Sequence, residues 1–298
     1  MDFKQLESFI TIAKYNSFSK ASRELYLTQP TLSNHIQNLE KELMTQLFER
    51  HGKTIELTHV GRIFRDYAIE LIKKRDSALF QINNIIGQFG GTVELPYSTV
   101  PGEIVVPQLV AEFTQAFPGI RFKLRHLDSQ DVIDAIADKK FSFGFVGSKP
   151  NNDFDSLKVY EEDMVFIGPK QNPLPNKSVG LEQILALPMI VREEGSGSGS
   201  ILSKELAKHN LLTHELNIVA IAEGFHIAKK LVALGAGFAF VPRSFALEYA
   251  KDDVLIYELD NIQTKREFYF VHHKKATLTP LENQFKNFII EKFSNPSK

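Results

Sequence analysis

The spacing of hydrophobic positions divides the chain into two parts. Through residue 88, apolar residues recur every three or four positions and only one Pro interrupts them, which predicts helices throughout. From Gly90 onward, short β-branched and aromatic runs alternate with helical patterns of about ten residues. This alternation predicts βαβ units and a mostly parallel sheet. We therefore expect a domain boundary near Gly90 and Gly91.

The first part is predicted to begin with three short helices. Their apolar repeats start near Phe3, Phe18 and Thr28 or Gln29, and Pro30 falls in the first turn of the third helix. Uncharged hydrogen-bonding side chains occupy the outward face of that helix: Gln29, Thr31, Ser33, Asn34, Gln37 and Asn38. Acids appear only at its far end. A short helix, a turn and a second helix with this polar face form an arrangement that can place the second helix in the DNA major groove. Acidic side chains there would be repelled by the phosphates. The alternative is the solvated face of an ordinary helical bundle.

A hairpin and a long helix are predicted next. Residues 50–58 read as two extended pieces around a Gly turn, with Arg50, His51 and Lys53 at the tip, where they would touch phosphates. From Thr58 to about Phe89, apolar positions recur at near-heptad spacing, which predicts a helix roughly 45 Å long. One domain of this size cannot cover a whole face of such a helix. We expect the same helix of a second copy to pack against its apolar face. The alternative is that this helix packs across its own domain.

In the second part, four predicted loops follow strands and carry small or hydroxyl residues. They contain Ser98 and Thr99, Gly147 and Ser148, the run from Gly195 to Ser200, and Gly224 to His226. In open parallel sheets, ligands bind beyond the carboxyl ends of the strands, so the four loops are expected to converge. Hydroxyls and free amides at helix starts suit a small anion, although plain helix capping explains them too. The glycine spacing does not fit a nucleotide-binding loop.

Composition narrows the functional classes. The 298 residues include 35 Lys+Arg and 36 Asp+Glu, so the whole chain is nearly neutral. Residues 1–65 are slightly basic, with nine Lys or Arg and seven Asp or Glu. The absence of Cys excludes disulfides, thiolate metal sites and thiol redox sensing. No run approaches the roughly 18 apolar residues of a membrane span, and the start lacks the pattern of a signal peptide. A cytoplasmic protein without a membrane partner is expected.

Catalytic and metal-binding machinery is not expected. His272 and His273 are adjacent, so both cannot face one metal from a strand. His126, His209 and His214 have no acid at ligand spacing. An enzyme using the Gly-Ser run as an oxyanion or phosphate cradle would need a nucleophile and a base that the sequence does not supply. We therefore expect no cofactor, no metal and no enzymatic activity.

Several motifs in residues 1–65 resemble the winged helix-turn-helix of the LysR-type transcriptional regulators. They are Phe18–Leu25, Thr28–Ser33, Leu39 with Glu40, Leu47–Arg50, and Leu57 and Thr58 with Gly61. The remainder is similar to the family's effector-binding domain, a two-lobed α/β fold like type 2 periplasmic binding proteins. The resemblance implies an α/β multidomain protein with a winged helix-turn-helix at 1–58, a linker or dimerisation helix at 59–89 and an effector-binding domain at 92–298. Lobe one would be 92–162 and 267–298, and lobe two 163–266.

The resemblance also implies site residues. The DNA-binding set is Ser19, Gln29, Pro30, Thr31, Ser33, Asn34, Gln37, Arg50 and Lys53. The effector-binding set is Ser98, Thr99, Ser148, Ser196, Gly197, Ser198, Gly224 and His226. This sequence departs from the family at Asn34, where Arg is frequent, at His35, where Gln is frequent, and at Ser142, where Asp is usual. At Met44 a Gly usually ends the helix, and the Cβ of Met predicts a different helix end.

The function expected from the resemblance is DNA-binding transcription regulation controlled by a small anionic metabolite. The sequence around Ser98 and Gly195 is similar to that of regulators of sulfur metabolism. Sulfate, thiosulfate and an acetylated amino acid are therefore candidate effectors. Expected partners are double-stranded promoter DNA, the chain itself as homodimer or homotetramer, and RNA polymerase. We expect an activator, although repression remains open. The alternative is a cytoplasmic solute-binding-like protein without promoter-specific DNA binding, against which the amino-terminal module argues.

Overall fold

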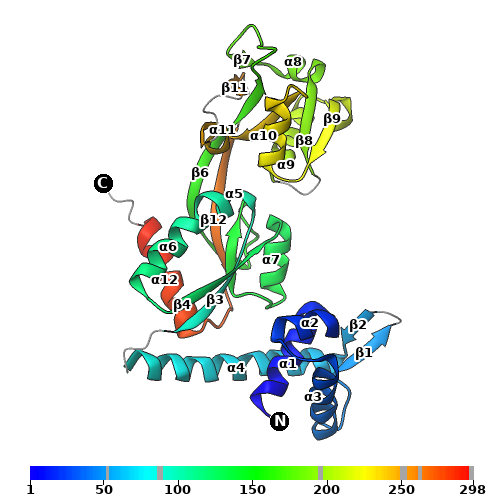
Figure 1. The fold of residues 1–298 in the computed structure, drawn as a ribbon, viewed down its shortest axis with the longest axis vertical. Helices are drawn as coiled ribbons and strands as arrows, with labels where there is room; N and C mark the ends of the chain where they lie inside the picture. Colours follow the sequence, from blue (N-terminus) through cyan, green and yellow to red (C-terminus); the bar gives the residue numbers. More distant parts are fainter. Residues whose placement is uncertain (52–53, 86–89, 194–196, 249–253, 261–263, 295–298) are drawn as a thin grey trace. The chain divides into compact units, whose positions relative to one another are not determined.

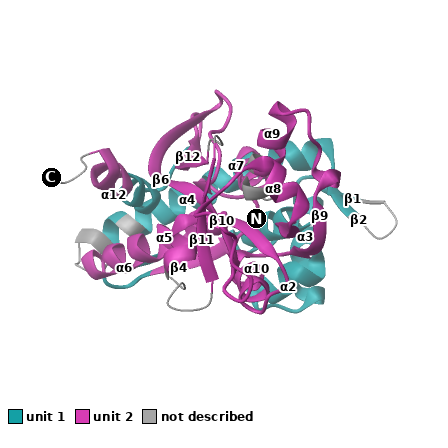
Figure 2. Cartoon of the chain, turned by 90° about the horizontal axis from the view of Figure 1, so that it is seen from above, with its two compact units in different colours: residues 1–91, 118–120, 277–286 teal, residues 92–117, 121–276, 287–298 magenta. Residues whose placement is uncertain are grey.

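The computed structural model describes residues 1–51, 54–85, 90–193, 197–248, 254–260 and 264–294 (Figure 1). The chain divides into two compact units (Figure 2). Unit 1 contains residues 1–91, 118–120 and 277–286, and unit 2 contains 92–117, 121–276 and 287–298. In the described part of the chain, no helix combines the length and the apolar character needed to cross a membrane.

Unit 1 begins with the helices and the hairpin that the sequence predicts. Its elements are α1 (Phe3–Tyr15), α2 (Phe18–Leu25), α3 (Gln29–Glu42), β1 (Phe48–His51), β2 (Thr54–Leu57) and α4 (His59–Ile85). Side chains cap the first three helices: Asp2 accepts a hydrogen bond from the amide of Gln5 at 2.8 Å, Ser17 from that of Lys20 at 3.2 Å, and Thr28 from that of Thr31 at 3.3 Å. The predicted starts of all three helices are confirmed.

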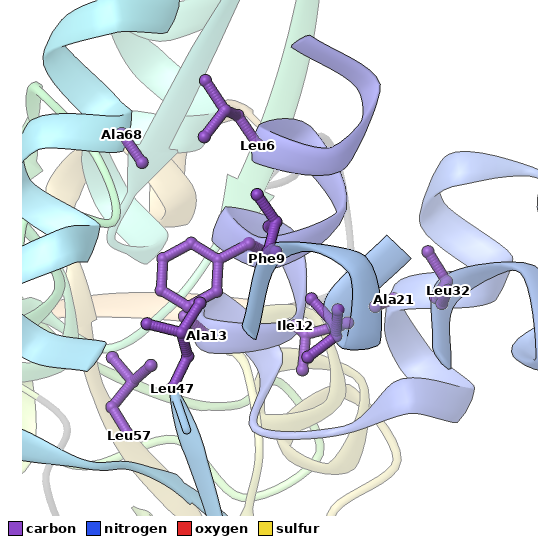
Figure 3. Packing of buried hydrophobic residues seen from close by; sticks show 11 residues of the cluster. Leu6, Phe9, Ile12, Ala13, Ala21, Leu32, Leu47, Leu57 and Ala68 are labelled. Carbon is purple, nitrogen blue, oxygen red and sulfur yellow. The ribbon is translucent and has the colours of Figure 1, made fainter. Parts of the chain in front are cut away.

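Phe9 lies in the middle of the core of unit 1 (Figure 3). Its ring centroid is 5.3 Å from that of Phe48 on β1 and 5.0 Å from that of Phe64 on α4. The core also takes buried residues from α1, α2, α3, α4 and the hairpin region: Leu6, Ile12, Ala13, Ala21, Leu32, Ile36, Leu39, Leu47, Leu57 and Ala68. Because α3 buries Leu32, Ile36 and Leu39 here, its opposite, polar face is turned to solvent.

The end of α3 differs from the sequence expectation. Leu43 caps the helix, and Met44 follows in the left-handed conformation, with φ of 52°. The amide of Met44 donates to Lys41 O at 3.4 Å and that of Thr45 donates to Glu40 O at 3.1 Å, which is the Schellman pattern. The prediction that Met44 makes this helix end differently is wrong. The two backbone hydrogen bonds outweigh the steric cost of a Cβ in the left-handed region.

Replacing Met44 by Gly is expected to stabilise unit 1 by roughly 0.5–1 kcal/mol. A side chain costs about 1–2 kcal/mol in left-handed geometry, and the extra entropy of Gly in the unfolded chain returns part of that gain. Because Met44 is 89% exposed, its removal forfeits little packing. Thermal unfolding of the full chain measures the change. Gln46→Gly, at an exposed position without positive φ, is the control and should not raise the midpoint. An unchanged or lower midpoint for Met44→Gly would contradict the strain.

Unit 2 is built on a ten-stranded sheet. Its strands are β3 (Gly91–Tyr97), β4 (Ile120–His126), β5 (Phe143–Val146), β6 (Phe154–Pro169), β7 (Ser178–Val179), β8 (Pro188–Arg192), β9 (Asn217–Ala222), β10 (Phe238–Pro242), β11 (Val254–Leu259) and β12 (Lys265–His273). The helices are α5 (Thr99–Ile104), α6 (Val106–Ala116), α7 (Ser129–Ala137), α8 (Leu181–Ala186), α9 (Gly197–Lys208), α10 (Phe225–Ala233) and α11 (Arg243–Glu248), with a 3₁₀ turn at Thr213–Glu215. The last helix, α12 (Pro280–Ser294), has residues 280–286 in unit 1 and the rest in unit 2.

Two long strands join the halves of this sheet. The sheet order is β4-β3-β5-β12-β6-β10-β8-β9, with β11 also paired to β6. We call the half with β3, β4 and β5 lobe one and the half with β8, β9 and β10 lobe two. β6 pairs with β12 through residues 154–163 and with β10 and β11 through residues 164–169, so it belongs to both (Figure 1). β12 and β6 run antiparallel, as do β10 and β6. The expectation of a mostly parallel sheet is therefore corrected to a mixed sheet.

Candidate functional site

The predicted DNA-contacting residues of α2 and α3 gather on one surface of unit 1. Gln29, Pro30, Asn34 and Gln37 are exposed, and Thr31 and Ser33 are partly exposed beside them. Ser19, from the start of α2, is also exposed and accepts a hydrogen bond from Gln29 Nε2 at 3.0 Å. This contact ties the amino-terminal turns of the two helices together. The surface offers amide and hydroxyl groups that can pair with base edges.

The two acids near the end of α3 are engaged in contacts within unit 1. Glu40 Oε1 accepts the amide hydrogens of Leu47 at 2.8 Å and Phe48 at 3.3 Å, where β1 begins. Glu42 forms an ion pair with the terminal amine of Met1. His35 lies on the side toward α1, where its Nδ1 is hydrogen-bonded to the buried Ser8 Oγ at 2.7 Å. This departure from the family pattern therefore fixes α3 to α1 and leaves the outward face uncharged.

β1 and β2 form the expected hairpin. They pair antiparallel, from Phe48 opposite Leu57 to His51 opposite Thr54. Arg50 lies in β1 opposite Ile55, but its side chain is outside the described part. Lys53, predicted at the tip, also lies outside the described residues. We call this hairpin the wing.

In lobe one, the ends of β3 and β5 bring part of the predicted effector set together. The amide of Ser98, directly after β3, donates to Phe145 O on β5 at 2.9 Å. The Ser98 hydroxyl is buried, and among the described residues it has no hydrogen-bond partner. Thr99 Oγ1 is hydrogen-bonded to His126 Nε2 at 3.1 Å. Ser148 is exposed two residues beyond the end of β5.

The predicted residues of lobe two are arranged around the start of α10. Gly224 precedes this helix with φ of 96°, and its amide hydrogen-bonds the Glu193 carboxylate. His226 Nε2 lies 2.9 Å from Glu103 Oε2 on α5, so this pair connects lobe two to lobe one. Gly197 and Ser198 open α9, but their side-chain positions are not described. Ser196 lies outside the described residues.

Two arginines that the sequence reasoning missed lie at these strand ends. Arg266, on β12, is 7% exposed, and its Nη2 donates to Gly147 O at 3.3 Å. Arg192 ends β8, donates to Glu193 Oε2 from Nε at 2.7 Å, and has its guanidinium carbon 4.3 Å from the Phe225 ring centroid. The position of Arg192 three residues before the Gly-Ser run was an available signal. Arg266 gave none, because a charged residue in Lys265-Arg266-Glu267 reads as exposed strand.

Burial governs the charge states of these groups. The pKa of Arg266 is lowered to about 10: burial is the main cause, the negative charge of Glu162 opposes it, and the nearby positive charge of Arg192 acts in the same direction as burial. Burial also acts to raise the pKa of Glu193. Hydrogen bonds from Arg192 and from backbone amides outweigh this effect, so the pKa of Glu193 is lowered overall. The site can therefore hold positive charge. Within the described ranges, no group of three or more His, Asp or Glu side chains is placed to hold a metal ion.

Two family models match the chain. The model described as "Bacterial regulatory helix-turn-helix protein, lysR family" matches residues 3–62. The model described as "LysR substrate binding domain" matches residues 87–294. Among curated proteins, the HTH-type transcriptional activator CmpR of Synechocystis sp. is 28% identical over 288 residues, which cover 96% of this chain and 93% of that protein.

Solved structures of similar fold cover nearly the whole chain. Full-length CbnR in complex with its target DNA is 20% identical, with a TM-score of 0.62 over 98% of this chain and 99% of that chain. A full-length OxyR variant from Pseudomonas aeruginosa is 17% identical, with a TM-score of 0.68 over 99% of this chain and 96% of that chain. The amino-terminal helix-turn-helix and the two-lobed α/β domain are therefore confirmed as the fold.

Proposed function

Because the chain belongs to the LysR family of bacterial transcriptional regulators, we propose that it activates transcription from a promoter when a small anion binds to its two-lobed domain. The family makes it a DNA-binding, effector-controlled, oligomeric regulator and not an enzyme. We propose further which residues contact DNA, to which chemical class the effector belongs and that the regulator is an activator. Activation is supported by CmpR, a relative named as a transcriptional activator.

The proposed DNA contacts are carried by the uncharged outward face of α3. Gln29, Thr31, Ser33, Asn34 and Gln37 would read base edges in the major groove. Ser19 and Pro30 would lie against the backbone at the start of the two helices. Arg50 and Lys53 of the wing would contact phosphates. The observation that supports this assignment best is that Glu40 and Glu42 are engaged in contacts with Leu47, Phe48 and Met1, away from the two turns that would enter the groove.

Asn34→Ala is expected to weaken binding to the cognate site by about 1–3 kcal/mol and to relax the preference at one base pair, because Asn pairs best with an adenine edge. The measurement is a mobility shift of a promoter fragment over a salt series, with single-base variants of the bound site. The salt slope should stay unchanged, since Asn34 neutralises no phosphate.

The matched control is Asn38→Ala, one turn further along the same exposed face. It is expected to leave the base preference intact, because the groove diverges from the helix toward its acidic end. Equal losses for both variants would refute the assignment of Asn34. Absence of sequence-selective retention of any promoter fragment by the wild-type chain at every salt concentration would refute the proposed function.

The proposed effector is a small oxyanion or carboxylate, with sulfate, thiosulfate and an acetylated amino acid as candidates. It would bind among Ser98, Thr99, Ser148, Ser196, the first two residues of α9, Gly197 and Ser198, and Gly224, with His226 at the margin. Hydroxyl groups support an anion because they donate hydrogen bonds to it. If the anion binds one arrangement of the two lobes more tightly than another, it would increase the population of that arrangement. This shift would reposition the DNA-reading helices.

A second copy of the chain would pair through α4. One face of this helix contributes Phe64, Ala68 and Ile72 to the core of unit 1. A neighbouring face carries exposed apolar residues at helical spacing, which we call the α4 stripe: Val60 at 42%, Ile63 at 50%, Tyr67 at 64%, Leu71 at 41% and Ile82 at 55% exposed. Pairing would cover the stripe and duplicate the reading helix on a dyad-related site. Contact of the assembled dimer or tetramer with RNA polymerase is part of the proposal.

A further inference from the structure

We propose that Arg266 is the residue that binds the anionic group of the effector, with the Ser98 hydroxyl as a second donor. This inference rests on the proposed function, which supplies a small anion but no charged residue to hold it. The chemical class of ligand is an oxyanion with two or more free oxygens, whether inorganic sulfate, phosphate or the carboxylate of an organic acid.

The guanidinium of Arg266 is buried without a counter-ion in direct contact. Arg266 is 7% exposed, and among the described residues its guanidinium has one hydrogen-bond partner, Gly147 O at 3.3 Å, and no ion pair. A guanidinium carries five N–H donors, so most of its hydrogen-bonding capacity is unused. Burying a charge in this state is unfavourable, and a ligand with several acceptor oxygens would relieve the cost.

Ser98 lies close to the same strand end. Its amide is bonded to Phe145 O, and Gly147, which accepts the Arg266 hydrogen bond, follows two residues later on the same strand end. Its hydroxyl oxygen is buried and lacks a partner in the described part of the chain. A buried hydroxyl group without a hydrogen-bond partner is unfavourable and therefore requires an explanation. An anion bound to Arg266 would accept a hydrogen bond from the Ser98 hydroxyl.

Two other charged residues near Arg266 have hydrogen-bond partners of their own. Arg192 donates from Nε and Nη2 to the two carboxylate oxygens of Glu193, so its charge is paired. Glu162 lies opposite Arg266 in the β6–β12 ladder, and its Oε2 accepts the amide of Ser244 at 3.0 Å. Burial raises the pKa of Glu162, which makes it a weaker counter-ion. In the described part of the chain, Glu162 and Arg192 act on the Arg266 guanidinium through their charges alone, in opposite directions, and neither forms a hydrogen bond or ion pair with it.

Gly147 allows the guanidinium to lie against the backbone. A Cβ built on Gly147 would come within 2.6 Å of Arg266 Nη2 and 3.5 Å of Ser129 Oγ. Ser129 Oγ accepts the amide of Gly147 at 2.9 Å and holds this strand end in place. Any side chain at position 147 would therefore push the guanidinium away from its present position without removing its charge.

The test is Arg266→Met in the full chain, with thermal unfolding in sodium sulfate, phosphate or acetate against sodium chloride of equal ionic strength. Without added anion, the variant is expected to melt roughly 2–8 °C above wild type, because a buried charge without an ion-pair partner in direct contact has been removed. The midpoint of the wild type is expected to rise in at least one of the three anions relative to chloride. That rise should be absent in Arg266→Met.

The matched control is Arg243→Met, which removes an arginine of the same unit that is partly exposed and paired with Glu258 Oε2 at 2.6 Å. It is expected to keep the anion response, to show no increase in midpoint, and to report the general salt effect of sulfate. Gly147→Ala is the second variant. It keeps the charge and displaces the guanidinium, so it should reduce the anion response without the increase in midpoint seen for Arg266→Met.

The outcomes separate this inference from the proposed function. If the wild type responds to an anion and Arg266→Met responds equally, the assignment of Arg266 is overturned while an anionic effector stands. If Arg266→Met melts below wild type and keeps the anion response, Arg266 is a structural residue. If none of the three anions changes the wild-type midpoint relative to chloride, this inference and the proposed anionic effector both fail, while DNA binding is tested separately by the mobility shift.

Discussion

Replacing Phe9 by Ala is expected to lower the unfolding free energy of unit 1 by about 3–5 kcal/mol. The ring is fully buried and contacts Phe48 and Phe64, so its loss removes the packing that joins α1, the wing and α4. Domains of this kind are stable by about 5–15 kcal/mol, so the loss takes a large share of the total. Sequence-selective DNA retention should fall in parallel, because α3 is oriented by the same core.

Hydrogen exchange followed by mass spectrometry measures this change locally. Amides of α1 and α3 should lose protection by a factor of about 100 or more, whereas those of β8 and β10 in unit 2 should not change. Phe3→Ala is the matched control on the same helix, since Phe3 is 46% exposed and its ring centroid lies 5.0 Å from the guanidinium carbon of Arg75. It should cost about 1 kcal/mol or less. Comparable losses for the two variants would show that the centre of the core is not Phe9.

The sequence predicted α2, α3 and the exposed polar face of α3 well because its signals are local. Ser17 and Thr28 each cap a helix from the residue before it, and Pro30 fits the first turn. The 3.6-residue period assigns Leu32, Ile36 and Leu39 to the core, which places the amide and hydroxyl side chains outside. The contact residues themselves remain a prediction.

The crossing strands were harder to predict. The apolar run that marked a strand at Asp163–Gly168 is the carboxyl half of β6, which begins at Phe154. Residues 155–158 and 160–163 include exposed and charged positions, because this half pairs with β12 at the surface of the sheet instead of filling a core. Hydrophobic periodicity detects burial, so a strand held mainly by pairing with a segment about a hundred residues later gives little signal.

Arg266 was missed for a related reason. Its one hydrogen-bond partner among the described residues, Gly147, lies 119 positions earlier in the chain. Only the register of β12 between β5 and β6 brings the two together. The prediction of an anion site from Ser and Gly residues therefore named residues at these strand ends without naming Arg266 beside them. Met44 shows the opposite case, where a local rule about Cβ was overridden by local hydrogen bonds.

Leu71→Glu is expected to convert the regulator from dimer or tetramer toward monomer. Leu71 lies in the middle of the α4 stripe, 41% exposed, between Tyr67 and the stripe's last member, Ile82. In a paired helix the new carboxylate would be buried against apolar side chains of the second copy, which is strongly unfavourable without a counter-charge. The fold of unit 1 should persist, since Phe64, Ala68 and Ile72 supply the packing of α4 on the core.

DNA affinity should fall by about 10²–10⁴, because a single reading module loses the effective concentration that its tethered partner supplied. Sedimentation velocity measures the assembly state, and fluorescence anisotropy with a retained promoter fragment measures affinity. Leu79→Glu is the matched control: Leu79 is 51% exposed on the same helix, but twelve residues from Tyr67 it points about a third of a turn away from the stripe. It should leave both readouts near wild type. A Leu71→Glu chain that sediments like wild type would show that the α4 stripe is not where the copies meet.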